Sequence, residues 1–370
     1  MTTPPDLSLG TPPTIREIKN GVIVPIPSDV DTMQPLNSGV LTPQNELVQE
    51  SVTWRDGREF SLPPRIPATD DIEKISGRMM FGGLMFGHFG HFLVETTARL
   101  WAYEQLKDQI DGIVFIPKVQ RRIDHVLNVY TPFLRLLGIE CPIYNLPDPA
   151  QFDSVYVPQQ GFGMFGMIEG LPEYRNFMRS RMGQKIADDG AKKLYISRSE
   201  LPQERGGLIG ETVIEAFLEA EGYRIFHPQK HKHQEQLEAY KSADFIISPD
   251  GSPLHMAALV VKPTTKIAVM ARRPNVAEQF ELQFKAFCDI DTVTIDALKC
   301  HWIPVNHARP SRLSYGELDF AKTYWSLKDG GLISGNTPWP DMTNAQRVNV
   351  MEVLEERQKI GFKLYEPPAA

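Results

Sequence analysis

The chain has 370 residues, of which 42% are hydrophobic and 23% charged, the composition of an ordinary globular protein. This length exceeds what one hydrophobic core usually organises, so we expect two domains. The formal net charge of −7 leaves no basic excess to displace counterions, which argues against a nucleic-acid partner. Cys141, Cys288 and Cys300 are odd in number and far apart, which favours a reducing compartment over a disulfide framework.

No stretch approaches the roughly 20 apolar residues that cross a bilayer. The N-terminus has neither the basic nor the apolar segment of a signal peptide. We therefore expect a cytoplasmic protein without a transmembrane segment. Peripheral membrane association through a partner stays open, and the sequence carries no signal for the oligomeric state.

The first part of the chain predicts little regular structure. Residues 1–75 are rich in proline and are expected to form an irregular leader with short strands at 21–26 and 46–54. From residue 77 a stretch rich in Gly, Met and Phe follows, which we expect to serve as flexible packing and to become helical near His91.

Two series of alternating strands and helices follow, which predicts an α/β protein with two Rossmann-like, doubly wound parallel sheets in series. Ligands of such sheets lie beyond the carboxyl ends of the strands, so two domains facing a central cleft are expected. The domains are predicted at 1–188 and 189–340, with a C-terminal helix at 341–370 that could return to the first domain. The expected strands are 111–117, 141–146, 154–157, 193–198, 223–227, 245–248, 266–270 and 292–295. The expected helices are 123–137, 173–187, 211–221, 234–242, 254–261, 276–288 and 343–359.

The stretch 243–260, ADFIISPDGSPLHMAALV, is the most informative one. An apolar strand, a turn containing Gly251 and a helix start are a common way to direct backbone N–H groups at an anion. Gly251 allows close backbone approach, and the N–H groups of Ser252 and Leu254 are expected to face a phosphate. His255 could add a donor. Asp250 is the awkward member, because a carboxylate repels phosphate; it could instead cap the helix or contact sugar hydroxyls.

Arg198 ends the predicted strand KLYISR, where a guanidinium could clamp a diphosphate, with Ser197 beside it. The alternative is an ordinary surface arginine. Glu211, Glu235 and Gln236 stand at helix starts. A carboxylate beyond a strand end can bind ribose hydroxyls, yet acids in a first helical turn are also favoured by the helix dipole.

His91, Glu95 and Arg99 are spaced at i, i+4 and i+8, which would align them on one helix face. His91 would then be a general base and Glu95 would orient it. The alternative is a surface pair of Glu95 with Arg99 and a capping role for His91. His88, His91 and Glu95 also have a metal-like spacing, although a zinc site usually needs further ligands.

Three blocks resemble glycosyltransferase family 61. They are GHFGHFLVETTARLW from Gly87, KLYISRS from Lys193 with Glu211 after it, and HQEQLEAYKSADFIISPDGSPLHMAAL from His233. The resemblance implies a GT-B architecture, an inverting mechanism and a nucleotide-sugar donor held by the C-terminal domain. The chain departs from the family pattern at Asp250, Pro253 and His88, and it is most similar to bacterial members that build capsular or extracellular polysaccharide.

We therefore predict a hexosyl- or pentosyltransferase that moves a sugar from a nucleotide sugar to an acceptor hydroxyl of a surface glycan or glycoconjugate. No DxD-type metal motif is evident among the candidate site residues, so metal independence is expected, with no cofactor besides the donor. The absence of GxxxxGK[ST] argues against a P-loop kinase. Two alternatives stay open: another nucleotide-sugar enzyme, such as an epimerase or hydrolase, and a non-catalytic glycan-binding or assembly protein.

Overall fold

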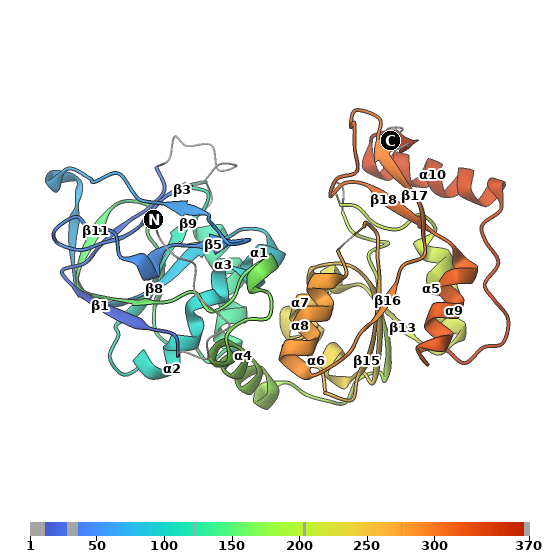
Figure 1. The fold of residues 1–370 in the computed structure, drawn as a ribbon, viewed down its shortest axis with the longest axis horizontal. Helices are drawn as coiled ribbons and strands as arrows, with labels where there is room; N and C mark the ends of the chain where they lie inside the picture. The colour runs from blue at the N-terminus through green and yellow to red at the C-terminus, as the bar shows by residue number, and fades with distance from the viewer. Residues whose placement is uncertain (1–11, 28–35, 122, 203–204, 275, 366–370) are drawn as a thin grey trace. The chain divides into compact units, whose positions relative to one another are not determined.

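The computed structural model describes residues 12–27, 36–121, 123–202, 205–274 and 276–365. The chain divides into two compact units, residues 1–185 and 186–370, each with its own sheet and core (Figure 1). Within the described residues, none of the helices is both long enough and apolar enough to cross a membrane.

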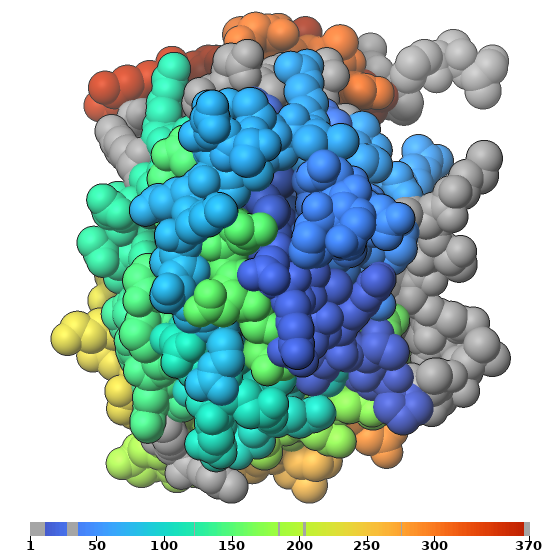
Figure 2. Space-filling view, turned by 90° about the vertical axis from the view of Figure 1, so that its left-hand side faces the viewer, coloured from blue at the N-terminus to red at the C-terminus, as the bar shows by residue number. Residues whose placement is uncertain are grey.

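The main sheet of the first unit is mixed. Its strands follow the order β10–β9–β8–β11–β2–β4, and β1 also pairs with β11. The first four are parallel, whereas β1, β2 and β4 run antiparallel to their neighbours, so the purely parallel sheet expected here is wrong. In Figure 2 the dark-blue N-terminal strands lie at the surface against green and teal segments of the same unit. The strands are β1 (Ile15–Lys19), β2 (Val22–Val24), β4 (Gly39–Leu41), β8 (Glu73–Met85), β9 (Gly112–Pro117), β10 (Ile143–Asn145) and β11 (Ala150–Pro158).

Strand β8 is the centre of this sheet, and the sequence analysis missed it. Its second half, from Met79 to Met85, is entirely buried. A Cβ on Gly82 would meet the ring of Phe115 at 2.4 Å, and Gly83 has a φ of +92°. The pairing with β9 shifts register here, so the two glycines form a β-bulge that lets neighbouring side chains approach the backbone.

The leader is more ordered than expected, but in short pieces. Residues 46–54, predicted as a strand, contain a 3₁₀ turn (Gln49–Ser51) and reach a strand only at Trp54. Two small two-stranded sheets complete the region. They pair β3 (Leu36–Asn37) with β7 (Ser61–Leu62), and β5 (Trp54–Arg55) with β6 (Arg58–Glu59).

The helix expected from His91 is interrupted. Glu95 leaves helical geometry with a φ of −124°, and the chain continues as a 3₁₀ helix. This break rotates the following residues, so Arg99 does not share a face with His91 and Glu95 as its spacing had predicted. The helices of the unit are α1 (Phe89–Val94), the 3₁₀ helix η3 (Thr96–Ala102), α2 (Tyr103–Leu106), α3 (Ile123–Leu136) and α4 (Pro172–Lys185).

The second unit contains the fully parallel sheet that the sequence predicts. Its order is β13–β12–β14–β15–β16, so the first strand in the chain lies between the second and the third. Helices α6, α7 and α8 cover one face of the sheet, and α5 and α9 cover the other (Figure 1). The strands are β12 (Lys193–Ile196), β13 (Arg224–Phe226), β14 (Phe245–Pro249), β15 (Lys266–Met270) and β16 (Val293–Ile295). The helices are α5 (Glu211–Ala220), α6 (His233–Ser242), α7 (Ser252–Ala257), α8 (Glu278–Cys288) and α9 (Phe320–Asp329).

The C-terminal residues belong to the second unit. Val350, Met351 and Leu354 of α10 (Asn344–Gln358) pack against the core of that unit. Beside it lies a small antiparallel sheet that the sequence did not predict (Figure 1). Its strands are β17 (Leu298–Pro304), β18 (Tyr315–Leu318) and β19 (Phe362–Leu364).

The core of the first unit depends on Arg99, which is fully buried. Its Nε donates to the carbonyl of Pro158 at 3.1 Å, and its Nη2 donates to the carbonyls of Val52 and Glu50 at 2.8 and 3.1 Å. Burial lowers the pKa of Arg99 to about 9. The side chain therefore joins β11 to the leader and has a structural role.

Arg99→Met should destabilise the first unit by about 3 kcal/mol, because three carbonyl acceptors lose a charged donor. Urea unfolding followed by tryptophan fluorescence measures the change. Arg58→Met, at an exposed position, is the control and should unfold like the wild type. Equal midpoints for the two variants would contradict the structural role of Arg99.

Candidate functional site

Both main sheets reverse their strand order next to their first parallel strand. In the first unit β8 lies between β9 and β11, and in the second β12 lies between β13 and β14. Open α/β sheets bind ligands at such switch points, beyond the carboxyl ends of the strands. Residues that follow β8, β9, β12, β14 and β15 are therefore the candidates.

In the first unit, the residues after β8 form a chain of three side chains. Nδ1 of His91 lies 2.6 Å from Oε2 of Glu95, whose carboxylate is fully buried. Nε and Nη2 of Arg55 donate to the two oxygens of the same carboxylate at 2.8 Å each. Glu95 is thus paired with Arg55 and His91, and the surface pair of Glu95 with Arg99 does not form.

This arrangement prepares His91 for proton transfer. The carboxylate, held by the Arg55 guanidinium, can accept a hydrogen bond from Nδ1–H of the neutral ring, which leaves Nε2 as the basic nitrogen. No hydrogen bond to Nε2 occurs among the described residues, and the side chain is 34% exposed. The His91 ring also stacks on Phe86, with 5.4 Å between centroids.

Lys118, which follows β9, adds a cation to the same edge. Its Nζ lies 5.2 Å from the ring centre of Phe86 and 5.6 Å from that of Phe60, over which Arg55 also lies. Burial, and then the charge of Arg55, lower the pKa of Lys118. The site therefore combines one base, one buried carboxylate and two cations.

The metal-like spacing of His88, His91 and Glu95 does not become a cluster. The rings of His88 and His91 meet edge to face at 5.4 Å, and Nδ1 of His91 is engaged with Glu95. In the parts of the chain that the structure describes, no group of three His, Cys, Asp or Glu side chains could hold a metal ion.

In the second unit, Arg198 and Gly251 meet at the switch point. Arg198 follows β12, and its Nε and Nη2 donate to the carbonyl of Gly206 at 3.3 and 2.9 Å. Gly251 follows β14, and a Cβ there would lie 2.7 Å from Nη1 of Arg198. Glycine is therefore needed for this close approach, and the half-buried Nη1 has no hydrogen bond among the described residues.

Asp250 is neutralised by arginines that follow β15. The backbone N–H and Nη2 of Arg272 donate to its two carboxylate oxygens at 2.8 and 2.7 Å, and Nη2 of Arg273 lies 3.8 Å away. Asp250 neither caps α7 nor lies open to a phosphate or a sugar. Nη1 of Arg272 and Nε of Arg273 are buried without a hydrogen-bond partner in the described residues, a state that an anionic ligand would relieve.

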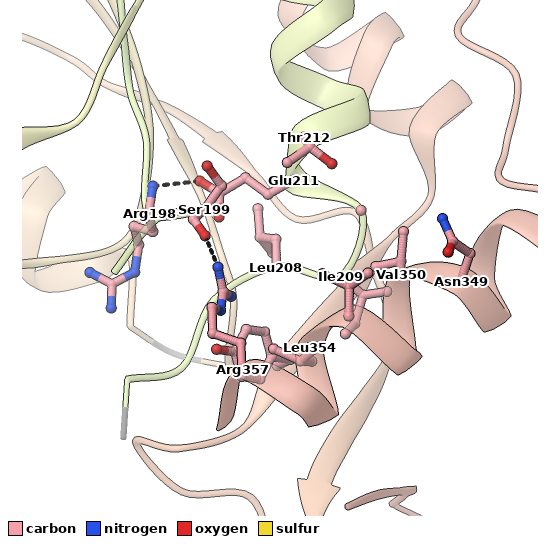
Figure 3. A pocket seen from close by; sticks show the side chains of 13 residues that line it. Arg198, Ser199, Leu208, Ile209, Glu211, Thr212, Asn349, Val350, Leu354 and Arg357 are labelled. Carbon is pink, nitrogen blue, oxygen red and sulfur yellow. Dashed lines mark hydrogen bonds between the residues drawn. The ribbon is translucent and has the colours of Figure 1, made fainter. Parts of the chain in front are cut away.

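Ser197 and Glu211 form the layer beneath Arg198. Oε1 of the buried Glu211 accepts the backbone N–H of Arg198 at 2.7 Å and the hydroxyl of Tyr195 at 3.1 Å (Figure 3). Ser197 is also buried and donates to Glu215 at 2.5 Å. Burial raises the pKa of Glu211. These side chains position the loop that carries Arg198, and Glu211 also lines a pocket beside α5.

The remaining predicted residues are held in local structure. Glu235 is exposed and accepts the backbone N–H of Lys232 at 2.9 Å, as a helix cap. The buried Gln236 donates to the carbonyl of Pro228, and Nδ1 of His255 lies 2.5 Å from Gln283. These contacts give Glu235 the capping role that its position in the first turn had left open.

The turn after β14 presents fewer amides than expected. The N–H of Leu254 donates to the carbonyl of Gly251 at 3.0 Å and so does not face a ligand, contrary to the prediction. Ser252 begins α7, whose six residues are too few for a strong dipole. The positive charge at this edge therefore comes mainly from the arginines.

The family model of glycosyltransferase 61 matches residues 89–268, close to half of the chain. The chain belongs to glycosyltransferase family 61. As a glycosyltransferase it uses a donor and an acceptor substrate. The family 61 match begins just before His91 and ends within β15, so it includes Arg198 and Asp250 but neither Arg55 nor Arg272. No curated protein matches the chain.

The sequence analysis of this glycosyltransferase missed two cationic partners and left others undecided. Arg55 and Lys118 carry no local signal, because Arg55 lies in the leader and Lys118 follows an otherwise ordinary strand. Arg272 and Arg273 stand directly after a predicted strand, which was a usable signal for the carboxyl edge of the sheet. Their contact with Asp250 depends on the pairing of β14 with β15.

Asp250→Ala should destabilise the second unit by about 3 kcal/mol, because it leaves the buried Arg272 unpaired. The double variant Asp250→Ala/Arg272→Met should recover part of this loss. Urea unfolding measures both. Asp296→Ala, at an exposed position of the same unit, should have no effect. An Asp250→Ala protein as stable as the Asp296→Ala control would show that the pair contributes nothing.

Proposed function

We propose that this family 61 enzyme transfers a sugar, with inversion at the anomeric carbon, from a nucleotide sugar to an acceptor hydroxyl. The observation that supports this most is the meeting of Arg198 with Gly251 at the switch point of the parallel sheet, inside the segment that the family matches. A guanidinium at the carboxyl edge of such a sheet is suited to hold a diphosphate.

The second unit would bind the donor diphosphate. Arg198 offers Nη1, and Arg272 offers the buried Nη1 that has no partner in the described residues. Both arginines flank Gly206: its carbonyl accepts from Arg198, and a Cβ on it would lie 3.4 Å from Nη1 of Arg272. Two cations on either side of one short segment suit a ligand with two phosphates. Because Asp250 is already paired with Arg272, its charge would not oppose the diphosphate.

The first unit would activate the acceptor. Nε2 of His91 would take the proton of the acceptor hydroxyl, and Glu95 would stabilise the imidazolium that forms. Arg55 would hold Glu95 in place. Lys118 lies close enough to contribute to acceptor binding.

The reaction balances without another reactant. The acceptor oxygen attacks the anomeric carbon as its proton passes to His91, and a new C–O bond forms. The bond between the anomeric carbon and the phosphate oxygen breaks, and the nucleoside diphosphate leaves with the electron pair. Arg198 and Arg272 stabilise the charge that develops on the leaving group. Metal independence, a GT-B architecture, a cytoplasmic location and an acceptor in bacterial surface polysaccharide are further parts of the same proposal.

A screen of nucleotide sugars for slow donor hydrolysis tests this function without knowledge of the acceptor. Hydrolysis of one donor, with release of its nucleoside diphosphate, is the expected result. A thermal-shift panel of nucleoside diphosphates accompanies it. If no nucleoside diphosphate stabilises the protein and no donor is hydrolysed, the non-catalytic binding protein replaces the enzyme.

Arg198→Ala should weaken nucleoside diphosphate binding roughly tenfold or more, because a charge-assisted hydrogen bond to phosphate is lost. Isothermal titration calorimetry measures the affinity. Arg224→Ala, at an exposed position on β13, is the matched control and should bind like the wild type. Unchanged affinity in Arg198→Ala would remove Arg198 from the donor site.

His91→Ala should lower the rate of transfer by about 10² to 10⁴, the usual contribution of a general base, while nucleotide affinity is unchanged. Initial rates with the donor found in the screen, together with calorimetry, separate the two effects. His125→Ala alters an exposed histidine on α3 and should keep full activity. A His91→Ala enzyme with normal turnover would disprove the assignment of the base.

A further inference from the structure

A pocket opens between α5 and α10 of the second unit, with a volume of about 180 Å³. One wall is the segment from Leu208 to the first turn of α5, and the other is one face of α10 (Figure 3). On α10 the lining residues recur at helical spacing, with Asn349, Val353 and Arg357 at successive turns. Of the residues that line this pocket, the function proposed above uses only Arg198.

The lining combines apolar walls with a polar rim. Leu208 and Leu354 are buried and apolar, and Val353 is 58% exposed where the pocket opens. The amide of Asn349 and the hydroxyl of Thr212 supply donors and acceptors. Apolar walls with a few polar groups suit a heterocyclic ring, which buries its faces and hydrogen-bonds along its edge.

The position of the pocket restricts its ligand further. Arg198 lines the pocket and also lies against Gly251 at the switch point. Arg357 reaches from α10 to the carbonyl of Ser199, next to Arg198 (Figure 3). A molecule that fills the pocket and extends to Arg198 therefore has an uncharged planar end and an anionic end. A nucleotide has this composition.

The size of the pocket agrees with that ligand. One water needs roughly 10–15 Å³ of such volume, so the pocket has room for about a dozen atoms of that size or slightly more. This number is close to the number of non-hydrogen atoms in a base with its ribose, and it is too small for a chain of sugars. We propose that the pocket between α5 and α10 binds the nucleoside portion of the donor, an inference that rests on the donor function proposed above.

The assignment has a consequence for specificity. Thr212 and Arg198 lie within the segment matched by family 61, whereas α10 lies beyond it. The helix would therefore add base recognition of this chain's own to a phosphate site whose Arg198 lies in the family segment. Asn349, as the uncharged polar side chain of α10 that lines the pocket, is the residue that would hydrogen-bond to the edge of the base.

Val353→Trp tests the proposal because it fills the pocket from an exposed position. Val348→Trp is the matched control: Val348 is on the same helix, is 56% exposed and does not line the pocket. Calorimetry with UDP, GDP, CDP, ADP and inorganic pyrophosphate gives the affinities. Circular dichroism and thermal unfolding of each variant establish that it folds, and Asn349→Ala serves as a second variant that does not add bulk.

We expect the wild type and Val348→Trp to bind one nucleoside diphosphate more tightly than pyrophosphate. Val353→Trp should lose at least about tenfold in nucleotide affinity, a change of about 1.4 kcal/mol, and keep its affinity for pyrophosphate. Asn349→Ala should selectively weaken the binding of the preferred nucleotide.

Three results would overturn the assignment, and they are distinguishable. Normal nucleotide binding by Val353→Trp would place the nucleoside elsewhere and leave the donor function intact. A parallel loss of pyrophosphate binding would place the phosphates, not the nucleoside, in the pocket. Failure of the wild type to bind any nucleotide or pyrophosphate would reject the donor function and this inference together.

Discussion

The buried contact between Asp250 and Arg272 organises the carboxyl edge of the second sheet. It joins the residues that follow β14 to those that follow β15, and both side chains are almost completely buried. Buried ion pairs add little net stability but are costly to break, because removal of one partner leaves an unpaired charge. The contact therefore fixes the turn at Gly251, against which Arg198 lies.

The first unit contains the same kind of contact, a buried carboxylate paired with an arginine, formed by different residues. Glu95 is a buried carboxylate at the carboxyl edge of a parallel sheet, and an arginine distant in the sequence binds both its oxygens. In each unit the arginine offsets the free-energy cost of burying the carboxylate. The carboxylate then holds a neighbouring group in position. In one unit the neighbour is the ring of His91, and in the other it is the turn that approaches Arg198.

How well each feature could be predicted depends on how far apart in the sequence the residues that form it lie. Strands β14 and β15 were predicted correctly, because a buried parallel strand is a continuous apolar run. The equally buried β8 was missed, because Gly82 and Gly83 make the bulge at its centre look like a loop. Asp250 was recognised as awkward, but its partner Arg272 is 22 residues away and adjacent only through strand pairing. The spacing of His91, Glu95 and Arg99 also gave a wrong prediction for Arg99, because the helix breaks at Glu95. No nearby residue signals that break.

The geometry separates two tasks that a glycosyltransferase must perform. Phosphate binding requires cations at fixed positions, and the second unit places them on loops between parallel strands, where backbone pairing controls their spacing. Base recognition requires a surface that can vary, and on the proposed assignment α10 would offer one: Val350 and Leu354 hold the helix on the core and line the pocket together with the exposed Asn349 and Val353. Substitutions at Asn349 and Val353 leave the core contacts of Leu354 intact. A helix beyond the family segment could therefore change the preferred donor base without disturbing the proposed diphosphate site.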